Sequence, residues 1–402
     1  MKQRGLTNFF ESFLNKGLIF ESKKALQAAY TPEHVIHRDE QIRQIASMLA
    51  PALRMDKPSN LFMYGKTGTG KTLTIKYVLQ QMRQVASQQD IPLTLLYLNC
   101  KLKKVADTEY RLVSQLSREL GKAIPPTGLP TDEVYKVFFE AVDHKEQTII
   151  LVLDEIDQLV KRAGDSILYN LTRINSELKN SQITLVGISN DLMFTDTLDP
   201  RVKSSLSEEE VLFPPYNALQ IQNILRARAK EAFREGAVED GVIEKCAAFA
   251  AREHGDARRA LELLRVAGEL AERAQVDKVT IDHLDKAEEK IERDRVTDII
   301  MTQPKQFQAV LYSILCIPES KASFTFTGDV YELYTDVCAR TGLRPLTQRR
   351  VSDVIAELDM LGIVAAKVIS KGRYGRTREI SLNIPLSLRP KVHGILKEGL
   401  SL

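Results

Sequence analysis

Eight consecutive residues near position 70 have the types and spacing of a phosphate-binding loop. They match the pattern GxxxxGK[ST], follow a short apolar run at 61–65 and open a helical pattern. Glycines let successive backbone N–H groups turn toward phosphates, and a helix N-terminus adds partial positive charge. We therefore predict an ATP site in which Lys71 reaches the β and γ phosphates and the Thr72 hydroxyl ligates Mg²⁺. The predicted loop residues are Gly65, Lys66, Thr67, Gly68, Thr69, Gly70, Lys71 and Thr72.

Two further candidate catalytic residues end the apolar run at 148–155, which reads TIILVLDE. Parallel strands present their C-terminal ends at one edge of a sheet, so Asp154 and Glu155 should lie beside the phosphate-binding loop. Asp154 would hold magnesium through water, and Glu155 would orient or deprotonate the attacking water. The alternative is that these carboxylates, with Asp157, only cap the strand and begin a helix.

The elements that must position these residues are predicted by apolar runs that alternate with helical patterns. Continuous apolar runs are typical of strands buried on both faces of a parallel sheet. We predict an α/β ATPase domain over residues 1–214, with helices on both faces of the sheet and an N-terminal extension over 1–30. The expected strands are 61–65, 93–100, 148–155, 183–189 and a shorter fifth at 210–213.

The strand pattern stops after Pro214 and Pro215, and two further domains follow. Residues 215–296 contain about four amphipathic helical patterns and are predicted to form an all-α lid domain. Residues 297–402 are predicted to form a winged-helix domain, because three helical patterns precede a basic hairpin. The helical patterns lie near 303–317, 328–341 and 347–361, and the β-like runs at 363–370 and 378–384.

Positive charge is concentrated in this last domain. Residues 297–402 contain 14 Lys and Arg against 10 Asp and Glu, whereas the whole chain has a net charge of only +3. In the third helical pattern the apolar residues share one face, while Arg349 and Arg350 face outward near its N-terminal end, as in a helix that reads the DNA major groove. Either arginine could meet a base or a phosphate. The hairpin that follows would contact DNA through Lys371, Arg373, Tyr374, Arg376 and Arg378.

Composition excludes several other classes of protein. Of the 402 residues, 44% are hydrophobic, enough for a core in each domain. No apolar stretch has the length of a membrane span or the form of a signal peptide, so we expect a cytoplasmic protein without a membrane partner. With the predicted DNA-binding domain, it would be nucleoid-associated. The four cysteines are far apart and suggest neither a zinc site nor a disulfide framework.

Taken together, the motifs resemble the AAA+ superfamily and, within it, the archaeal origin-recognition and cell-division-control initiator family. The resemblance runs from about His37 to the C-terminus. It rests on KPSNLFMYGKTGTGKT, LVLDEID, GISND, LDPRVKSSL, EHGDARRALELLRVA and IERDRV, in that order.

The resemblance implies roles for residues outside the two first motifs. Asn190 would be the sensor-1 residue near the γ phosphate, or otherwise a turn or helix-cap residue. Arg258 would be the sensor-2 arginine of the lid, with Arg259 as its rival. Arg201 stands where the superfamily often has an arginine finger acting on a neighbouring subunit, or it forms a structural salt bridge. The segment from Tyr30 to Arg38 would form the adenine side of the site, with Val35, His37 and Arg38 bordering the base, or these three are otherwise loop residues.

The function implied by the resemblance is initiation of DNA replication. The chain would bind double-stranded origin DNA under control of ATP and ADP, hydrolyse ATP slowly as a switch, and recruit or load a replicative MCM-type helicase, with other initiator subunits as further partners. An ATP-gated transcription regulator with the same C-terminal fold is the alternative. A clamp loader would end in a helical collar, which this chain lacks.

Overall fold

The computed structural model describes residues 19–402 except 28–29, 102–107, 126–127, 207, 253–254, 318–324, 371–375 and 387. The chain divides into two compact units, Met1–Leu284 and Asp285–Leu402. The division falls inside helix α12 (Ile281–Thr302), as does the boundary that we predict between lid and winged-helix domains at 296 and 297. Each unit is described by itself below.

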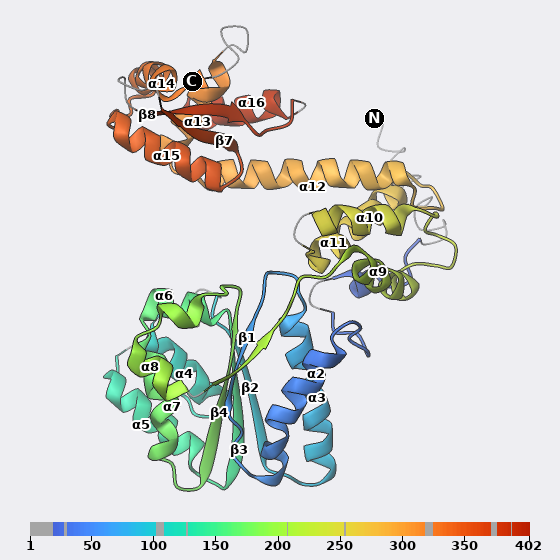
Figure 1. Ribbon diagram of the computed structural model, residues 1–402, viewed down its shortest axis with the longest axis vertical. Coiled ribbons are helices and arrows are strands. Elements are labelled where there is room, and N and C mark those ends of the chain that lie inside the picture. Colours follow the sequence, from blue (N-terminus) through green and yellow to red (C-terminus); the bar gives the residue numbers. More distant parts are fainter. Residues whose placement is uncertain are drawn as a thin grey trace, which may run out of the picture. The chain divides into compact units, whose positions relative to one another are not determined.

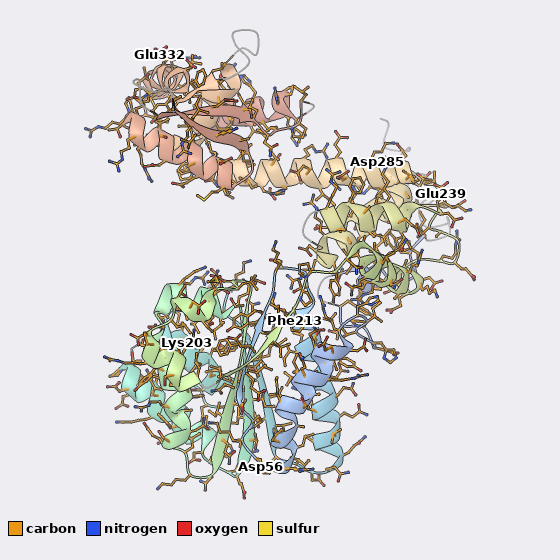
Figure 2. All side chains as sticks on the ribbon, in the orientation of Figure 1. Asp56, Lys203, Phe213, Glu239, Asp285 and Glu332 are labelled. Carbon is orange, nitrogen blue, oxygen red and sulfur yellow. The ribbon has the colours of Figure 1, made fainter. Side chains whose placement is uncertain are left out.

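The first unit is built on a five-stranded sheet with the order β2-β3-β4-β1-β5, and all neighbouring strands are parallel (Figure 1). All five predicted strands are confirmed. Figure 2 labels Asp56, which precedes β1, and Phe213, which follows β5, at opposite ends of the sheet. The strands are β1 (Asn60–Tyr64), β2 (Leu93–Asn99), β3 (Gln147–Asp154), β4 (Ser181–Ser189) and β5 (Glu208–Leu212).

Both faces of the sheet are buried, as the continuous apolar runs predict. In β3, Ile150 and Val152 pack into one core cluster with residues of α2 (Asp39–Leu49) and α3 (Lys71–Gln88). The alternate residues, such as Leu151 and Leu153, pack into a second cluster beneath helices of the opposite face. That face carries α4 (Glu109–Glu119), α5 (Thr131–Val142), α6 (Ile156–Ala163), α7 (Ser166–Arg173), α8 (Pro200–Leu206) and the short helices η3 (Ile174–Ser176) and η4 (Phe194–Thr197). The short helix η2 (Ala50–Arg54) packs on the first face with α2 and α3.

The lid follows the sheet domain in the same unit. Its helices are α9 (Ala218–Ala232), α10 (Val242–Arg252) and α11 (Ala257–Arg273), and α12 begins at its end. Asn217 starts α9 through a capping box with Gln220. The short helix η1 (Lys23–Leu26) lies against the lid, because Phe20 stacks on Phe233 with ring centroids 4.6 Å apart. The described part of the N-terminal extension therefore packs on the lid.

The second unit contains the predicted winged helix. Helices α13 (Lys305–Cys316), α14 (Thr327–Thr341) and α15 (Gln348–Met360) precede strands β7 (Val364–Ser370) and β8 (Arg376–Leu382). These strands form an antiparallel sheet with the two-residue strand β6 (Thr325–Phe326), in the order β6-β8-β7. The sequence pattern missed β6 and the final helix α16 (Arg389–Leu400). Over the described residues, none of the helices combines the length and apolarity of a membrane span.

Candidate functional site

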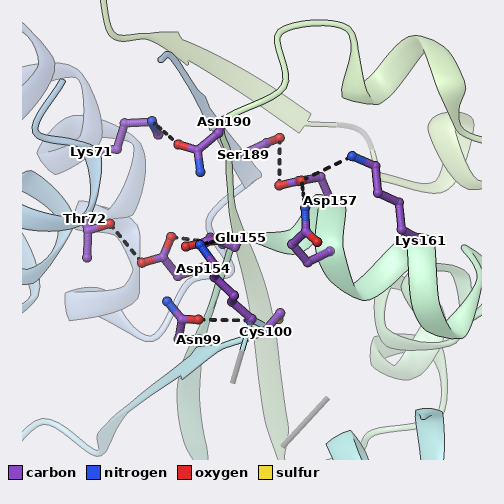
Figure 3. A network of polar contacts seen from close by, with 12 residues as sticks. Lys71, Thr72, Asn99, Cys100, Asp154, Glu155, Asp157, Lys161, Ser189 and Asn190 are labelled. Carbon is purple, nitrogen blue, oxygen red and sulfur yellow. Dashed lines mark hydrogen bonds and ion pairs between the residues drawn. The ribbon is translucent and has the colours of Figure 1, made fainter. Parts of the chain in front are cut away.

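The phosphate-binding loop joins the C-terminal end of β1 to the start of α3. Gly70 precedes the helix with φ of 90°, a left-handed conformation that glycine adopts without steric cost. The Lys71 ammonium donates hydrogen bonds to the carbonyl oxygens of Gly65 at 2.6 Å and Lys66 at 2.9 Å. Its third bond, of 2.9 Å, goes to Oδ1 of Asn190 at the end of β4 (Figure 3). The structure therefore brings the predicted loop lysine and the predicted sensor-1 residue into contact.

The electrostatics of the loop favour an anionic ligand. Lys71 is almost fully buried. Burial and the nearby Arg258 charge lower the Lys71 pKa from 10.5 to about 8, although Asp154, Asp157 and Glu155 oppose this shift. A phosphate group beside Lys71 would stabilise its charged form and so relieve the cost of burial. The site is prepared for a strongly negative ligand.

The carboxylate of Asp154 faces this loop from the end of β3. Thr72 Oγ1 donates to Asp154 Oδ2 at 2.8 Å (Figure 3). One hydroxyl and one carboxylate at this spacing suit Mg²⁺, which is usually held by one or two protein ligands together with phosphates and water. The predicted metal residues, Thr72 and Asp154, thus fit the ion that the fold implies.

A tyrosine that the sequence analysis missed also binds Asp154. The Tyr97 hydroxyl, on the neighbouring strand β2, donates to Asp154 Oδ2 at 2.6 Å. Burial and this hydrogen bond raise the Tyr97 pKa. Only the parallel register, which pairs Tyr97 with Val152 and Asn99 with Asp154, reveals this proximity.

Glu155 lies next to Asp154 in an unusual backbone conformation. Its φ is 55° and its ψ is 46°, a left-handed conformation that costs a non-glycine residue about 1 kcal/mol or more. Its backbone N–H donates to Asp154 Oδ1 at 3.0 Å, and its carboxylate lies 3.7 Å from the Lys101 ammonium. Strain of this kind is common where a catalytic side chain must point in a fixed direction.

Asp157, the third carboxylate of the motif, has a structural role. It is buried at the first turn of α6, and Ser189 donates to its Oδ1 at 3.3 Å, while Lys161 lies 3.7 Å from its Oδ2 (Figure 3). Ser189 Oγ also accepts a hydrogen bond from the backbone N–H of Asp191 at 3.0 Å. This network fixes the backbone on both sides of Asn190.

The lid reaches the phosphate-binding loop through the start of α11. Asp256 caps this helix by accepting from the backbone N–H of Arg258 at 2.8 Å, and Ala257 N–H donates to the Gly68 carbonyl at 3.3 Å. Arg258 is exposed, lines the pocket described next and lies close enough to Lys71 to lower its pKa. Arg259 is half-buried and does not line the pocket. This geometry favours Arg258 over Arg259 as the sensor-2 residue.

A pocket of about 620 Å³ lies between the phosphate-binding loop, the lid and the segment before α2. Gly68, Gly70 and Thr72 line one part of it. The rest is largely apolar and includes Val35, as predicted for the adenine side, together with residues that sequence analysis missed. Tyr30 and Ile36, which lie in the predicted adenine-side segment, also line the pocket, whereas the missed lining residues include Leu73, Ile224, Arg228 and Leu261.

His37 and Arg38 do not line this pocket, which differs from the predicted base contact. His37 Nε2 lies 3.2 Å from the Asn223 amide nitrogen of α9. Arg38 is buried, and it donates to the carbonyls of Thr69 at 2.9 Å and Pro214 at 2.6 Å. Its guanidinium also lies 3.9 Å from the centre of the Tyr216 ring. Arg38 therefore stabilises the phosphate-binding loop and links it to the segment after β5.

Arg201 lies on α8, outside the pocket. It is exposed, its backbone N–H bonds to Asp199 at 2.8 Å, and within the described part of the chain its side chain forms no ion pair. The position is compatible with a role toward another subunit and does not support the salt-bridge alternative.

In the second unit, α15 has the predicted two-sided character. Val351, Val354, Ile355 and Leu358 are buried, whereas Arg349 and Arg350 are exposed in the first turn. Thr347 caps the helix by accepting from the Arg350 backbone N–H. Figure 1 shows this helix beside the β7 and β8 hairpin.

The wing is attached to this helix through a predicted DNA-binding residue. Arg378, on β8, donates to Ser352 Oγ at 3.2 Å. Arg376 is the first residue of β8. The side chain of Arg376, and Lys371, Arg373 and Tyr374 entirely, lie outside the described residues.

Comparisons with known proteins agree with this architecture. The family models matched are "AAA domain" over residues 54–192, "Cdc6 AAA+ ATPase-type lid domain" over 222–289 and "CDC6, C terminal winged helix domain" over 298–388. An ORC1-type DNA replication protein of Thermococcus onnurineus is 53% identical over 388 residues, 96% of this chain and 93% of that relative. One from Archaeoglobus fulgidus is 50% identical over 375 residues, 93% of this chain and 90% of that relative.

A solved structure extends the likeness to three dimensions. The structure of the Aeropyrum pernix ORC1 protein in complex with DNA has a TM-score of 0.83 and 45% identity, covering 95% of this chain and 98% of that chain. The predicted family and the predicted fold are confirmed, and a replication role is favoured over the transcription-regulator alternative. This chain, with its AAA+ ATPase, lid and winged-helix domains, belongs to the family of ORC1-type DNA replication proteins.

Proposed function

We propose that this protein binds double-stranded origin DNA through its winged helix and that bound ATP or ADP sets the position of its lid. The observation that carries the proposal is the meeting of lid and phosphate-binding loop, where Ala257 bonds to Gly68 and Arg258 approaches Lys71. A γ phosphate beside Lys71 would attract Arg258, so ATP and ADP would hold α11 differently. The nucleotide would thereby control the winged-helix domain that follows the lid.

We propose roles for each group in the ATPase site. Lys71 would neutralise the β and γ phosphates, and Asn190, which already bonds Lys71, would contact the γ phosphate or the attacking water. Thr72 and Asp154 would hold Mg²⁺, whose charge would offset that of the phosphates. Glu155 would orient and deprotonate the water. The ion pair with Lys101 would keep Glu155 from its water for part of the time, consistent with slow hydrolysis and a switch function.

The DNA-binding role is assigned to the second unit. Arg349 and Arg350 would enter the major groove with the first turn of α15. Lys371, Arg373, Tyr374, Arg376 and Arg378 would lie along the backbone or in the minor groove. The Aeropyrum pernix relative solved with DNA supports this assignment.

We further propose that the DNA-bound protein recruits or loads a replicative MCM-type helicase and works with other initiator subunits. Arg201 would complete a neighbouring subunit's ATPase site in such an assembly, because its side chain is exposed. Binding to origin DNA would make the protein a cytoplasmic, nucleoid-associated one.

Fluorescence anisotropy tests the DNA-binding function. The purified protein is titrated against labelled origin-region duplex and a scrambled duplex at fixed salt, with ATP or with ADP. We expect the origin duplex to be preferred, the preference to depend on the nucleotide, and the Arg349→Ala/Arg350→Ala variant to lose it. Lys397→Ala, an exposed change on α16, is the control and should bind as wild type does. Equal, weak binding of both duplexes by the wild type would contradict the proposal.

A further inference from the structure

Arg228 is a buried cation in the wall of the nucleotide pocket that neither the phosphate-binding loop nor the catalytic groups use. It lies on α9, on the same pocket wall as Ile224 and Ala227, and only 6% of its surface is exposed. Burying a guanidinium costs free energy unless its N–H groups find acceptors. The burial of the Arg228 guanidinium therefore needs an explanation in terms of the groups that it binds.

The partners of Arg228 satisfy it only in part. One terminal nitrogen donates to the Tyr30 carbonyl at 3.2 Å, and the guanidinium lies 4.6 Å from the centre of the Tyr30 ring. The other terminal nitrogen is buried and has no hydrogen-bond acceptor among the described residues. Burial lowers the Arg228 pKa, while Glu231 and Tyr30 oppose this shift.

Tyr30 connects the same site to the N-terminal segment. Its hydroxyl donates to Glu231 Oε2 at 2.6 Å, one turn beyond Arg228 on α9. Tyr30, Arg228 and Glu231 all line the pocket. This cluster therefore joins the segment before α2 to the lid, and Val35 and Ile36 of that segment line the same pocket.

The ligand chemistry follows from the two ends of the pocket. The glycines of the phosphate-binding loop define the phosphate end. The apolar part beside Val35, Ile36 and Ile224 suits a flat aromatic ring. A purine nucleoside presents ring nitrogens and ribose oxygens that accept hydrogen bonds, and a guanidinium both donates to such acceptors and stacks on aromatic rings.

We propose that Arg228 recognises the nucleoside part of the bound nucleotide through its guanidinium and so ties α9 of the lid to the base. This inference rests on the proposed ATP binding and adds a second contact between nucleotide and lid. Arg258 would contact the phosphates, whereas Arg228 contacts the nucleoside. Both ATP and ADP would then hold the lid through the contact between Arg228 and the nucleoside. ATP would hold it further through the contact between Arg258 and the γ phosphate.

The test separates nucleoside contacts from phosphate contacts by including inorganic tripolyphosphate, which has the phosphates of ATP but no nucleoside. Affinities for ATP, ADP and inorganic tripolyphosphate are measured, with Mg²⁺, by competition against a fluorescent ADP. In Arg228→Met we expect at least a tenfold loss for both ATP and ADP, with unchanged tripolyphosphate affinity. Arg258→Ala should show the reverse pattern, losing more for ATP and tripolyphosphate than for ADP. Arg228→Lys should recover only part of the loss, because it lacks the planar fork.

Arg226→Met is the matched control, since Arg226 lies on the same helix, pairs with Glu244 at 2.7 Å and does not line the pocket. It should bind all three ligands as wild type does. An unchanged ATP affinity in Arg228→Met, or an equal loss for tripolyphosphate, would overturn the role of Arg228 while leaving ATP binding intact. Wild-type protein that binds tripolyphosphate as tightly as ATP would also overturn it. Failure of the wild type to bind ATP at all would remove the proposed function as well.

Discussion

The hydroxyl of Tyr97 and the hydroxyl of Thr72 donate to the same oxygen of Asp154, with Tyr97 at 2.6 Å and Thr72 at 2.8 Å. Tyr97 therefore holds the carboxylate that is expected to position Mg²⁺ while remaining on a separate strand. Removing the Tyr97 hydroxyl should let Asp154 rotate without creating a cavity of more than one oxygen atom.

We expect Tyr97→Phe to lower ATP hydrolysis about tenfold and to raise the Mg²⁺ concentration needed for half-maximal rate. A hydrogen bond to a charged group contributes about 1.5–3 kcal/mol, enough for an effect of this size. Steady-state rates over a Mg²⁺ series, and Mn²⁺ binding followed by electron paramagnetic resonance, measure it. Tyr110→Phe, which removes a hydroxyl bonded to the Pro125 carbonyl, is the control. An unchanged Mg²⁺ requirement would rule out this positioning role.

Gly68 should not tolerate a side chain. Its φ is 75°, and a Cβ atom there would lie 1.7 Å from Oδ1 of Asp256, the residue that caps α11. We expect Gly68→Ala to displace the lid and abolish measurable ATP binding in calorimetry.

Gly121→Ala separates steric clash from backbone strain in this experiment. Gly121 has a similar φ of 85°, but nothing lies within 4 Å of its added Cβ. It should cost about 1 kcal/mol of stability and leave ATP affinity unchanged. Equal ATP binding by the two variants would refute the proposed close contact between lid and loop.

ATP affinity should fall as pH rises above about 8. The nucleotide-free protein has a Lys71 pKa of about 8, so at higher pH it must take up a proton to pair Lys71 with phosphate. The decrease in affinity approaches tenfold per pH unit for one proton bound. Calorimetric titrations at pH 7, 8, 9 and 10 measure this decrease. Lys71→Met should bind ATP weakly, and its affinity should not show this dependence on pH.

The same lysine has the opposite effect on folding stability. Its pKa is lower in the folded protein than in the unfolded chain, so the unfolded chain binds more protons between about pH 8 and 10.5. The contribution of Lys71 to the free energy of unfolding therefore rises with pH across this window. Denaturant midpoints of wild type minus those of Lys71→Met should increase from pH 8 to 10, and a decrease would contradict the assigned direction of the shift.

Glu155→Gln should separate ATP binding from ATP hydrolysis. The amide cannot take a proton from water, and loss of a general base usually slows a reaction by about 10²–10⁴-fold. The Glu155 backbone N–H would still bond to Asp154, so ATP affinity should be preserved. Single-turnover hydrolysis measures the first effect and calorimetry the second. Hydrolysis at the wild-type rate would exclude Glu155 as the base.

The wing should contribute to the salt dependence of DNA binding. Replacing Arg373 and Arg376 by alanine should weaken binding and reduce the log-log salt slope by about 0.9 for each phosphate that the protein no longer neutralises. Anisotropy titrations from low to moderate salt measure the slope, with Lys397→Ala as the control on α16. A slope equal to that of wild type would remove the wing from the DNA interface.

Local sequence patterns determined much of this protein. Strands β1 to β4 were predictable because each contains a continuous apolar run, whereas β5 (EEEVL) contains only a short one. The phosphate-binding loop was predictable because its eight residues are consecutive. The buried stripe of α15 was predictable from helical spacing. Helix α16 also carried a pattern, with Val392, Leu396 and Leu400 buried at intervals of four, but β6 has only two residues and leaves no periodic pattern.

Tertiary structure decided which distant residues meet. Nothing near Tyr97 in the sequence indicates that it binds Asp154, because the register of two parallel strands brings them together. Arg258 and Arg259 are adjacent in the sequence, and only the placement of α11 against the loop distinguishes them. Arg38 was expected at the base but braces the loop, and Arg228 enters the pocket from the lid. The sequence by itself determines elements and contiguous motifs, whereas contacts between separate elements depend on how those elements pack.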